Sequence, residues 1–271
     1  MDFPVKQGDQ GSDVVAVQQA LNRLGMLLTC DGKFGPGTGR AVSQACEILQ
    51  IAPRSEVDAP LWELLSERPD PCPDLPTQGV TFIAQAEVTS RQAYEQSYSH
   101  PTWPSPESGI TIGIGYDLQF SDEDQFRTDW GAFLPSDDLL ALLPWLKRVG
   151  SQQGVDDLKS THQSFYAAWS VFCDTTIPQT IIQCRTTFPG YDALPGLCRS
   201  ALVSLVYNRG PSLNGPSRVE MRTIHDLILA GNLAAVPEQF RNMKRLWQNL
   251  PGLVTRREGE AQMWEQGLQS S

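Results

Sequence analysis

The stretch Gly109–Leu118, GITIGIGYDL, decides how the larger part of the chain is interpreted. Its three isoleucines share one parity, so on an extended strand their side chains point to the same face. The opposite face carries Thr111, Gly113, Gly115 and Asp117 and is therefore nearly bare. The glycines either let another backbone approach closely or leave room for a ligand, with one hydroxyl and one carboxylate beside it.

The composition is that of an ordinary globular protein. The chain has 271 residues, of which 40% are hydrophobic and 19% charged, enough for one large domain or two modest ones. No apolar run approaches the roughly 20 residues that span a bilayer. The first residues, MDFPVKQGDQ, have neither the basic region nor the apolar core of a secretory signal. We therefore expect no membrane span, and synthesis in the cytoplasm without a signal peptide.

Charge and the metal-binding residue types restrict the partners. The formal net charge of −10 argues against nucleic acid, and it disfavours unspecific attraction to an acidic cell wall, although a local basic cleft can coexist with it. The three histidines form no HExxH pattern, and the six cysteines form neither a CxxC pair nor zinc-ligand spacing. We expect no metal and no cofactor. Without a signal peptide, buried free thiols are favoured over disulfides.

A proline-rich segment divides the chain. Residues 67–77, ERPDPCPDLPT, contain four prolines, which can continue neither a helix nor a central strand. We interpret this segment as a linker between a small module of residues 1–66 and a larger module of residues 78–271.

Apolar spacing in the small module predicts three helices. The first has Ser12 or Asp13 as its cap and ends at Gly25, the second starts at about Thr38, and a short third covers residues 60–65. The glycine-rich loop CDGKFGPGTG joins the first two. Such a unit has little core of its own.

The small module resembles the peptidoglycan-binding module found at the ends of many cell-wall hydrolases. The segment GSDVVAVQQALNRLGMLLTCDGKFGPGTGRAV, followed by VDAPLWELL, carries the resemblance over nearly all of residues 5–65. The signature positions are Gly11, Val14, Val17, Gln18, Leu21, Leu24, Gly25, Asp31, Gly32, Phe34, Gly35, Thr38, Ala41 and Val42. The family usually has an aromatic–glutamine pair late in the second helix, where this chain has Cys46 and Glu47. The resemblance implies a three-helix fold with peptidoglycan as partner; a module that merely spaces or docks is the alternative.

The larger module opens with a helical pattern in residues 79–98, GVTFIAQAEVTSRQAYEQSY. The apolar positions at helical spacing are Phe82, Ile83, Ala86 and Tyr94. Glu87 lies at the edge of this stripe, where partial desolvation raises the pKa of a carboxyl and suits it to donate a proton. A plain solvated helix charge is the alternative, as we expect for Glu95. The loop that follows carries Trp103, either a stacking surface for a sugar or a loop anchor.

The end of the chain is a run of helices. The segment LPGLCRSALVSLVYNRG predicts a buried helix stopped by Gly210, and RVEMRTIHDLILAG an amphipathic one. In the last helix, Thr255 and Glu258 have the spacing of a capping box. Together with GITIGIGYDL, this order predicts an α+β, mostly helical domain with a short β-hairpin sheet.

The order of these motifs resembles the phage-type lysozymes, especially the pesticin-like muramidases. The features shared with them are Glu87 on the first helix, the TIGIG hairpin of residues 111–115, the YN-G end of a central helix at Tyr207, Asn208 and Gly210, and a late GLVxRRxxE helix at residues 252–260. Together they span most of residues 80–265. The resemblance implies a lysozyme-like fold and cleavage of the glycan without a metal or cofactor.

The same resemblance implies the catalytic residues. The family uses a glutamate acid, a second carboxylate and a threonine, so Glu87 matches the acid and Thr111 the threonine. In ordinary phage lysozymes the second carboxylate precedes the threonine, which points to Glu107; in the pesticin-like pattern it follows by six residues, which selects Asp117. The wide gap between Glu87 and Thr111 favours Asp117. A straight strand separates residues 111 and 117 by roughly 20 Å, so Gly113 and Gly115 must bend or turn it.

Other polar residues are expected to have structural roles. Asn208 is a candidate sugar ligand, but we favour a cap at the helix end. Arg256 and Arg257 are expected to form structural ion pairs, with substrate contact as the alternative.

The resulting hypothesis is a two-domain muramidase that cleaves the β-1,4 bond between N-acetylmuramic acid and N-acetylglucosamine. It acts in the periplasm, either as a phage endolysin or as an antibacterial effector, and an effector implies a cognate immunity protein. A lytic transglycosylase and an inactive wall-binding protein are the alternatives, while an amidase or peptidase lacks the expected zinc or cysteine–histidine site. The stereochemical outcome, inversion or retention, depends on a carboxylate distance that the sequence does not contain.

Overall fold

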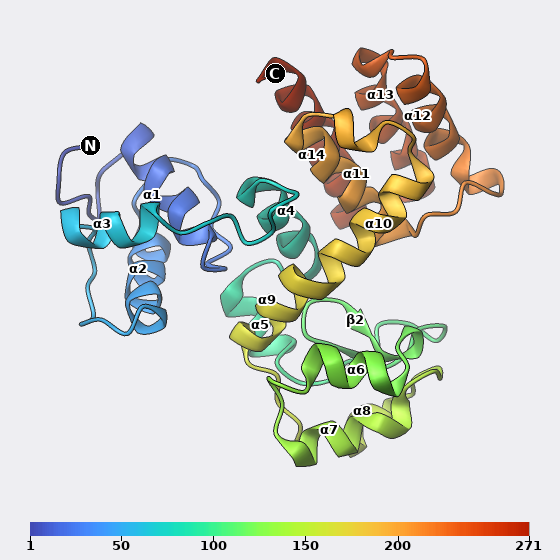
Figure 1. Cartoon of the computed structure of the whole chain (residues 1–271), viewed down its shortest axis with the longest axis horizontal. Helices are drawn as coiled ribbons and strands as arrows, with labels where there is room; N and C mark the ends of the chain where they lie inside the picture. The colour runs from blue at the N-terminus through green and yellow to red at the C-terminus, as the bar shows by residue number, and fades with distance from the viewer. Residues whose placement is uncertain (271) are drawn as a thin grey trace. The chain divides into compact units, whose positions relative to one another are not determined.

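The computed structural model describes residues 1–270, and these are mostly helical (Figure 1). Helices account for 61% of the chain, and the described part contains a single sheet, a two-stranded antiparallel hairpin. The predicted fold class is therefore confirmed. Residues 1–71 and 87–176 form one compact unit, and residues 72–86 and 177–271 form a second. Neither the predicted linker nor the predicted domain boundaries are tested by this grouping, and they stay a prediction.

The first unit starts with three helices: α1 (Ser12–Asn22), α2 (Pro36–Ile48) and α3 (Ala59–Ser66). They enclose a small apolar core that includes Val17, Leu21, Val42 and Leu61, all fully buried. The three predicted helices are therefore present. Cys46, where the resembling family has an aromatic residue, is fully buried in the same core, whereas Glu47 is exposed.

The predicted cap of α1 is wrong. The N-cap residue is Gly11, with φ 113°, and no side chain caps this end of the helix. The Gly11 N–H donates to the Gly32 carbonyl (2.9 Å), and a Cβ on Gly32 would lie 3.2 Å from the Gly11 carbonyl oxygen. This close approach of two backbones, and not a capping hydroxyl or carboxylate, sets the start of the helix.

The predicted helical segment 79–98 consists of two helices, α4 (Thr77–Val88) and α5 (Arg91–Ser97). Thr89 has a positive φ of 64° and ends α4. The Ser90 hydroxyl then accepts a hydrogen bond from the Ala93 N–H (3.1 Å) and caps α5. Ala86, expected to face inward, is exposed. Ile83 and Tyr94 of the predicted apolar stripe are fully buried, as expected, but the stripe is divided between two helices.

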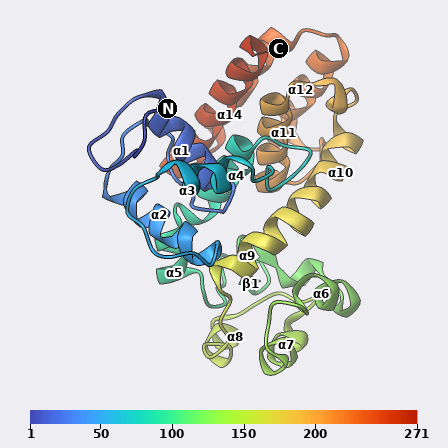
Figure 2. The same ribbon diagram turned by 60° about the vertical axis from the view of Figure 1, so that its left-hand side comes forward.

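The rest of the first unit surrounds the hairpin. Its elements are β1 (Thr111–Ile112), β2 (Tyr116–Asp117), a 3₁₀ turn η1 (Leu118–Phe120), α6 (Glu123–Trp130), α7 (Ser136–Leu142), α8 (Gln152–Asp157) and α9 (Phe165–Val171). A Cβ on Gly113 would lie 2.7 Å from the Trp130 ring of α6 and 3.4 Å from Ala168 of α9. The hairpin turn thus packs tightly between these two helices (Figure 2).

A turn of the N-terminal module packs on α5 and α9 within the first unit. Gly25 has φ 76°, and a Cβ on it would lie 3.0 Å from the rings of Phe165 and Trp169. Arg91 places its guanidinium 5.1 Å from the centroid of the Phe165 ring and donates to the sulfur of Met26 (3.7 Å). The positive φ and the tight contact both require glycine at position 25.

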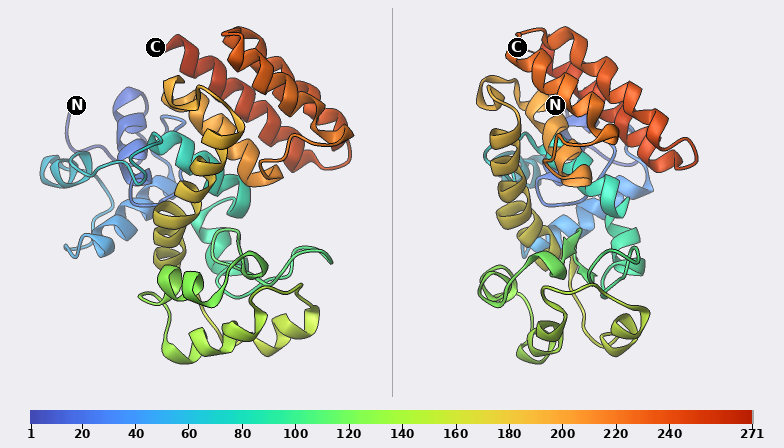
Figure 3. Two further views of the ribbon diagram at one scale, coloured as in Figure 1. Left: turned by 45° about the vertical axis from the view of Figure 1, so that its right-hand side comes forward. Right: turned by 90° about the vertical axis from the view of Figure 1, so that its right-hand side faces the viewer.

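The second unit is a helical bundle that also contains residues 77–86 of α4. Its other helices are α10 (Ile177–Thr187), α11 (Gly196–Arg209), α12 (Val219–Leu229), α13 (Val236–Asn242) and α14 (Pro251–Gln269). The long helix α14 packs against α11 and α13 (Figure 3). Gly210, with φ 71°, caps α11 as predicted. The capping box predicted at Thr255 is wrong, because α14 already begins at Pro251.

Two further expectations concern membranes and cysteines. Within residues 1–270, none of the helices combines the length and the apolar character needed to cross a membrane. No disulfide joins the six cysteines, and all of them except Cys30 are buried. The five buried cysteines therefore act as small apolar core residues.

Candidate functional site

The hairpin places Thr111 and Asp117 directly opposite each other. Strands β1 and β2 pair antiparallel, with Thr111 aligned to Asp117 and Ile112 aligned to Tyr116. Gly113 and Gly115 form the turn with φ values of 59° and 72°, in the region that favours glycine. The bend predicted at these two glycines is confirmed. The chain reverses here, so a hydroxyl and a carboxylate six residues apart in sequence become neighbours in space.

The hydrogen bonding around the pair indicates that the two side chains are close. Both backbone groups of Thr111 bond to Thr102, on the side away from β2. The next pair along the ladder is joined by the Leu118 N–H, which donates to the Ile110 carbonyl (2.9 Å). Thr111 and Asp117 are therefore a non-hydrogen-bonded pair, the type in which facing Cα atoms are about 4.5 Å apart and side chains approach most closely.

Local backbone groups hold the Asp117 carboxylate in place. Its Oδ2 accepts from the Gly109 N–H (3.1 Å) and from the Gln119 side-chain amide (3.2 Å), and its Oδ1 accepts from the Gln119 N–H (2.9 Å). A Cβ on Gly109 would lie 2.2 Å from Oδ1, so only glycine leaves room for the carboxylate. Asp117 is half-buried and caps η1. The result is a partly exposed carboxylate in a fixed orientation, as a catalytic group needs.

A buried polar network supports the hairpin from behind, and sequence reasoning did not find it. The Tyr116 hydroxyl donates to Asp129 Oδ2 (2.8 Å) and accepts from the Ser121 hydroxyl (2.8 Å). The Gln125 side chain also donates to Asp129, at 2.7 Å. Burial raises the pKa of the Tyr116 hydroxyl, which therefore stays protonated. Tyr116 is next to Asp117 in β2, so this network positions the strand that carries the carboxylate.

Glu87 is the last charged residue of α4 and belongs to the same compact unit as the hairpin. Its side chain is half-buried. Two residues later, Thr89 adopts φ 64°, which is unfavourable for a β-branched residue. Strained backbone of this kind costs of order 1–3 kcal/mol and gathers at functional sites. Leu27, Gln50 and Lys147 also have a positive φ and belong to no proposed site, so the role of Glu87 as the acid stays a prediction.

The two other candidates in the hairpin's neighbourhood have different positions. Glu107 is exposed, and its backbone carbonyl accepts from the Gln119 side chain (3.4 Å); it is not the cross-strand partner of Thr111. Trp103 is half-buried, donates its indole N–H to the Ser108 carbonyl (3.3 Å), and lies so close to Gly150 that a Cβ there would be 2.8 Å from its ring. These contacts favour the loop-anchor interpretation, and stacking on a sugar stays a prediction.

The remaining candidates lie in the second unit. Asn208 is an exposed residue inside α11, one position before its last residue. Arg256 and Arg257 are buried in α14 and interact with Glu260 of the same helix, at 3.6 Å and 2.7 Å. Their expected structural ion pairs are therefore present. The described residues contain no group of three or more His, Cys, Asp or Glu side chains that could hold a metal ion.

Comparison with known proteins assigns one part of the chain. Residues 10–45 match the family described as "Putative peptidoglycan binding domain". This match covers α1, the glycine-rich loop and most of α2, and it includes the buried helix positions quoted from the sequence. No curated protein matches the chain. The N-terminal module therefore contains a peptidoglycan-binding domain at residues 10–45.

Proposed function

We propose that the protein is a muramidase, which hydrolyses the β-1,4 bond between N-acetylmuramic acid and N-acetylglucosamine in the peptidoglycan that its N-terminal domain binds. The observation that carries the proposal is the cross-strand pair of Thr111 and Asp117, with the Asp117 carboxylate fixed by three hydrogen bonds. Further support comes from Glu87, whose half-buried carboxyl lies in the last turn of α4, in the same unit.

The chemistry divides among these three side chains. Glu87 donates a proton to the glycosidic oxygen that leaves, while Asp117 opposes the developing positive charge of the sugar ring or activates water. The Thr111 hydroxyl, next to Asp117, holds that water. A carboxyl separation of about 6.5–9.5 Å goes with inversion and about 5–5.5 Å with retention, and the resemblance to pesticin-like muramidases favours inversion.

The biological setting follows from the bond that is cleaved. Such an enzyme acts on the cell wall in the periplasm, either as a phage endolysin or as an antibacterial effector delivered into a rival cell. An effector requires a cognate immunity protein in the cell that makes it.

The proposal is tested by the products formed from purified peptidoglycan. We expect soluble disaccharide-peptides with reducing N-acetylmuramic acid ends, identified by mass spectrometry. Products with anhydro-sugar ends would instead identify a lytic transglycosylase. If no soluble product forms under conditions in which a control lysozyme is active, the proposal is wrong. The protein would then be a wall-binding protein without this activity.

The second carboxylate is identified by comparing Asp117→Asn with Glu107→Gln. We expect Asp117→Asn to lower fragment release by about 10²–10⁴-fold, in the range of a lost acid–base group, and Glu107→Gln to leave it unchanged. The reason is that Asp117 lies opposite Thr111, whereas Glu107 is an exposed loop residue. Initial rates of fragment release measure both. The reverse ranking would assign the role to Glu107.

A further inference from the structure

The N-terminal module contains an open pocket that the catalytic proposal does not use. Its volume is about 450 Å³, within the range of ligand pockets. The lining residues are Lys6, Gln7, Pro36, Gly39, Arg40, Ser43, Ser55 and Glu56. Four of these positions belong to α2 and lie inside the matched residues 10–45. The other four come from the two segments that flank this match.

Backbone hydrogen bonds preform the walls of this pocket. Val5 and Val57 form an antiparallel bridge, with N–H to O distances of 2.9 and 2.8 Å in the two directions. The residues that line the pocket, 6–7 and 55–56, are the direct neighbours of this bridge. The Ser43 hydroxyl donates to the Arg54 carbonyl (2.9 Å) and ties α2 to the same wall. The backbone of a pocket held in this way needs little ordering when a ligand binds.

The charges in the pocket are mixed and available. Lys6, Arg40 and Glu56 are exposed, and within residues 1–270 none of the three side chains takes part in an ion pair or a hydrogen bond. Lys6 and Glu56 lie opposite each other beside the Val5–Val57 bridge, yet they do not pair. Two cations and one anion lining one pocket match a ligand that carries both carboxylates and an amine.

We propose that this pocket binds the stem peptide of peptidoglycan, at a residue that has both a free carboxylate and a free amine. The glycan strand offers hydroxyl and acetamido groups but no amine, whereas the peptide provides carboxylates for Arg40 and Lys6 and, in its diamino acid, an ammonium group for Glu56. The choice of ligand rests on the proposed function as a wall-degrading enzyme. The pocket then selects the wall by its peptide, independently of the residues that cleave its sugar chain.

The test is isothermal titration calorimetry, in which the full chain is titrated with the soluble tetrapeptide L-Ala–γ-D-Glu–meso-diaminopimelate–D-Ala. We expect binding, and a loss of about 10- to 100-fold in affinity in Arg40→Glu, as for a charge-assisted hydrogen bond. Lys33→Glu is the matched control, because it makes the same charge change on an exposed residue of the same module outside the pocket. Circular dichroism of each variant verifies folding, and Glu56→Gln is a milder second variant.

Three results would overturn the proposal. The first is no binding of the tetrapeptide by the wild-type chain. The second is equal loss in Arg40→Glu and Lys33→Glu. The third is unchanged affinity for a tetrapeptide with alanine in place of the diamino acid. The tetrapeptide has no glycosidic bond, so these results do not depend on hydrolysis. Fragment release by the wild-type chain, measured separately, shows whether the proposed catalytic function fails.

Discussion

Replacing Glu87 with glutamine is expected to lower fragment release from peptidoglycan by about 10²–10⁴-fold, the usual contribution of a general acid. Glutamine keeps the size and shape of the side chain and one of its two oxygens, but it cannot deliver a proton to the leaving oxygen. Glu87 lies in the last turn of α4, one residue before the helix ends. The measurement is the initial rate of dye release from labelled, purified cell walls.

Glu95→Gln is the matched control for this experiment. Glu95 lies on α5 in the same unit, is exposed, and contacts Arg91 at 3.9 Å. Such a surface pair contributes little to stability, so the variant is expected to fold and to keep the wild-type rate. Equal rates for Glu87→Gln and the wild-type chain would rule out Glu87 as the acid. An equal loss in both variants would indicate a general effect of removing negative charge.

The hairpin illustrates what could be predicted of the site from sequence. The spacing of Thr111 and Asp117 required a bend, and Gly113 and Gly115 were the residues able to form it; the structure has the turn at these positions. The sequence could not show that the two residues are cross-strand partners, because register depends on the packing of the turn between α6 and α9. The same holds for Asp129, whose contact with Tyr116 spans thirteen residues.

The helix ends were harder to predict than the helices. Ser12 and Asp13 are favourable capping residues, yet the hydrogen bond between Gly11 and Gly32 sets the start of α1. Likewise, Thr255 and Glu258 have the spacing of a capping box, but α14 begins four residues earlier, at Pro251. Capping propensity is local, and a contact with a distant backbone outweighs it. Apolar spacing predicts the helices themselves better because it reports which face is buried.

The largest effect on stability is expected from Glu260→Ala in α14. Glu260 is fully buried and accepts from the Ser204 hydroxyl (2.6 Å) and from Arg257 (2.7 Å), while Arg256 lies 3.6 Å away. Burial raises the pKa of its carboxyl, and the two guanidinium groups act in the opposite direction. Removing the carboxylate takes away a buried negative charge that both arginines contact. Loss of one partner from such a group costs about 3–5 kcal/mol in the free energy of unfolding, measured by urea denaturation.

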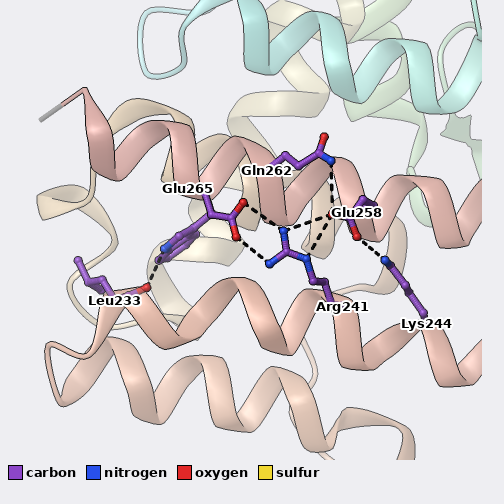
Figure 4. A network of polar contacts seen from close by, with 7 residues as sticks. Leu233, Arg241, Lys244, Glu258, Gln262 and Glu265 are labelled. Carbon is purple, nitrogen blue, oxygen red and sulfur yellow. Dashed lines mark hydrogen bonds and ion pairs between the residues drawn. The ribbon is translucent and has the colours of Figure 1, made fainter.

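Glu258→Ala, two residues earlier in the same helix, separates burial from charge. Glu258 accepts hydrogen bonds from Arg241 (3.2 Å), from Lys244 and from Gln262 (3.3 Å), but its side chain is one-third exposed (Figure 4). Because Arg241 also bonds Glu265, at 2.7 Å, it keeps a partner in the variant. We therefore expect a loss of about 0–1 kcal/mol, as for a surface ion pair.

The pH dependence of stability also distinguishes the partly exposed Glu258 from the buried Glu260. Lys244 and then Arg241 lower the pKa of the Glu258 carboxyl, so its stabilisation is present at neutral pH and is lost as the pH falls through the lowered pKa. Below that pH, Glu258→Ala and the wild-type chain are expected to unfold at the same urea concentration. Equal losses for Glu258→Ala and Glu260→Ala at neutral pH would contradict the argument, because they would show that the number of ion pairs matters and their burial does not.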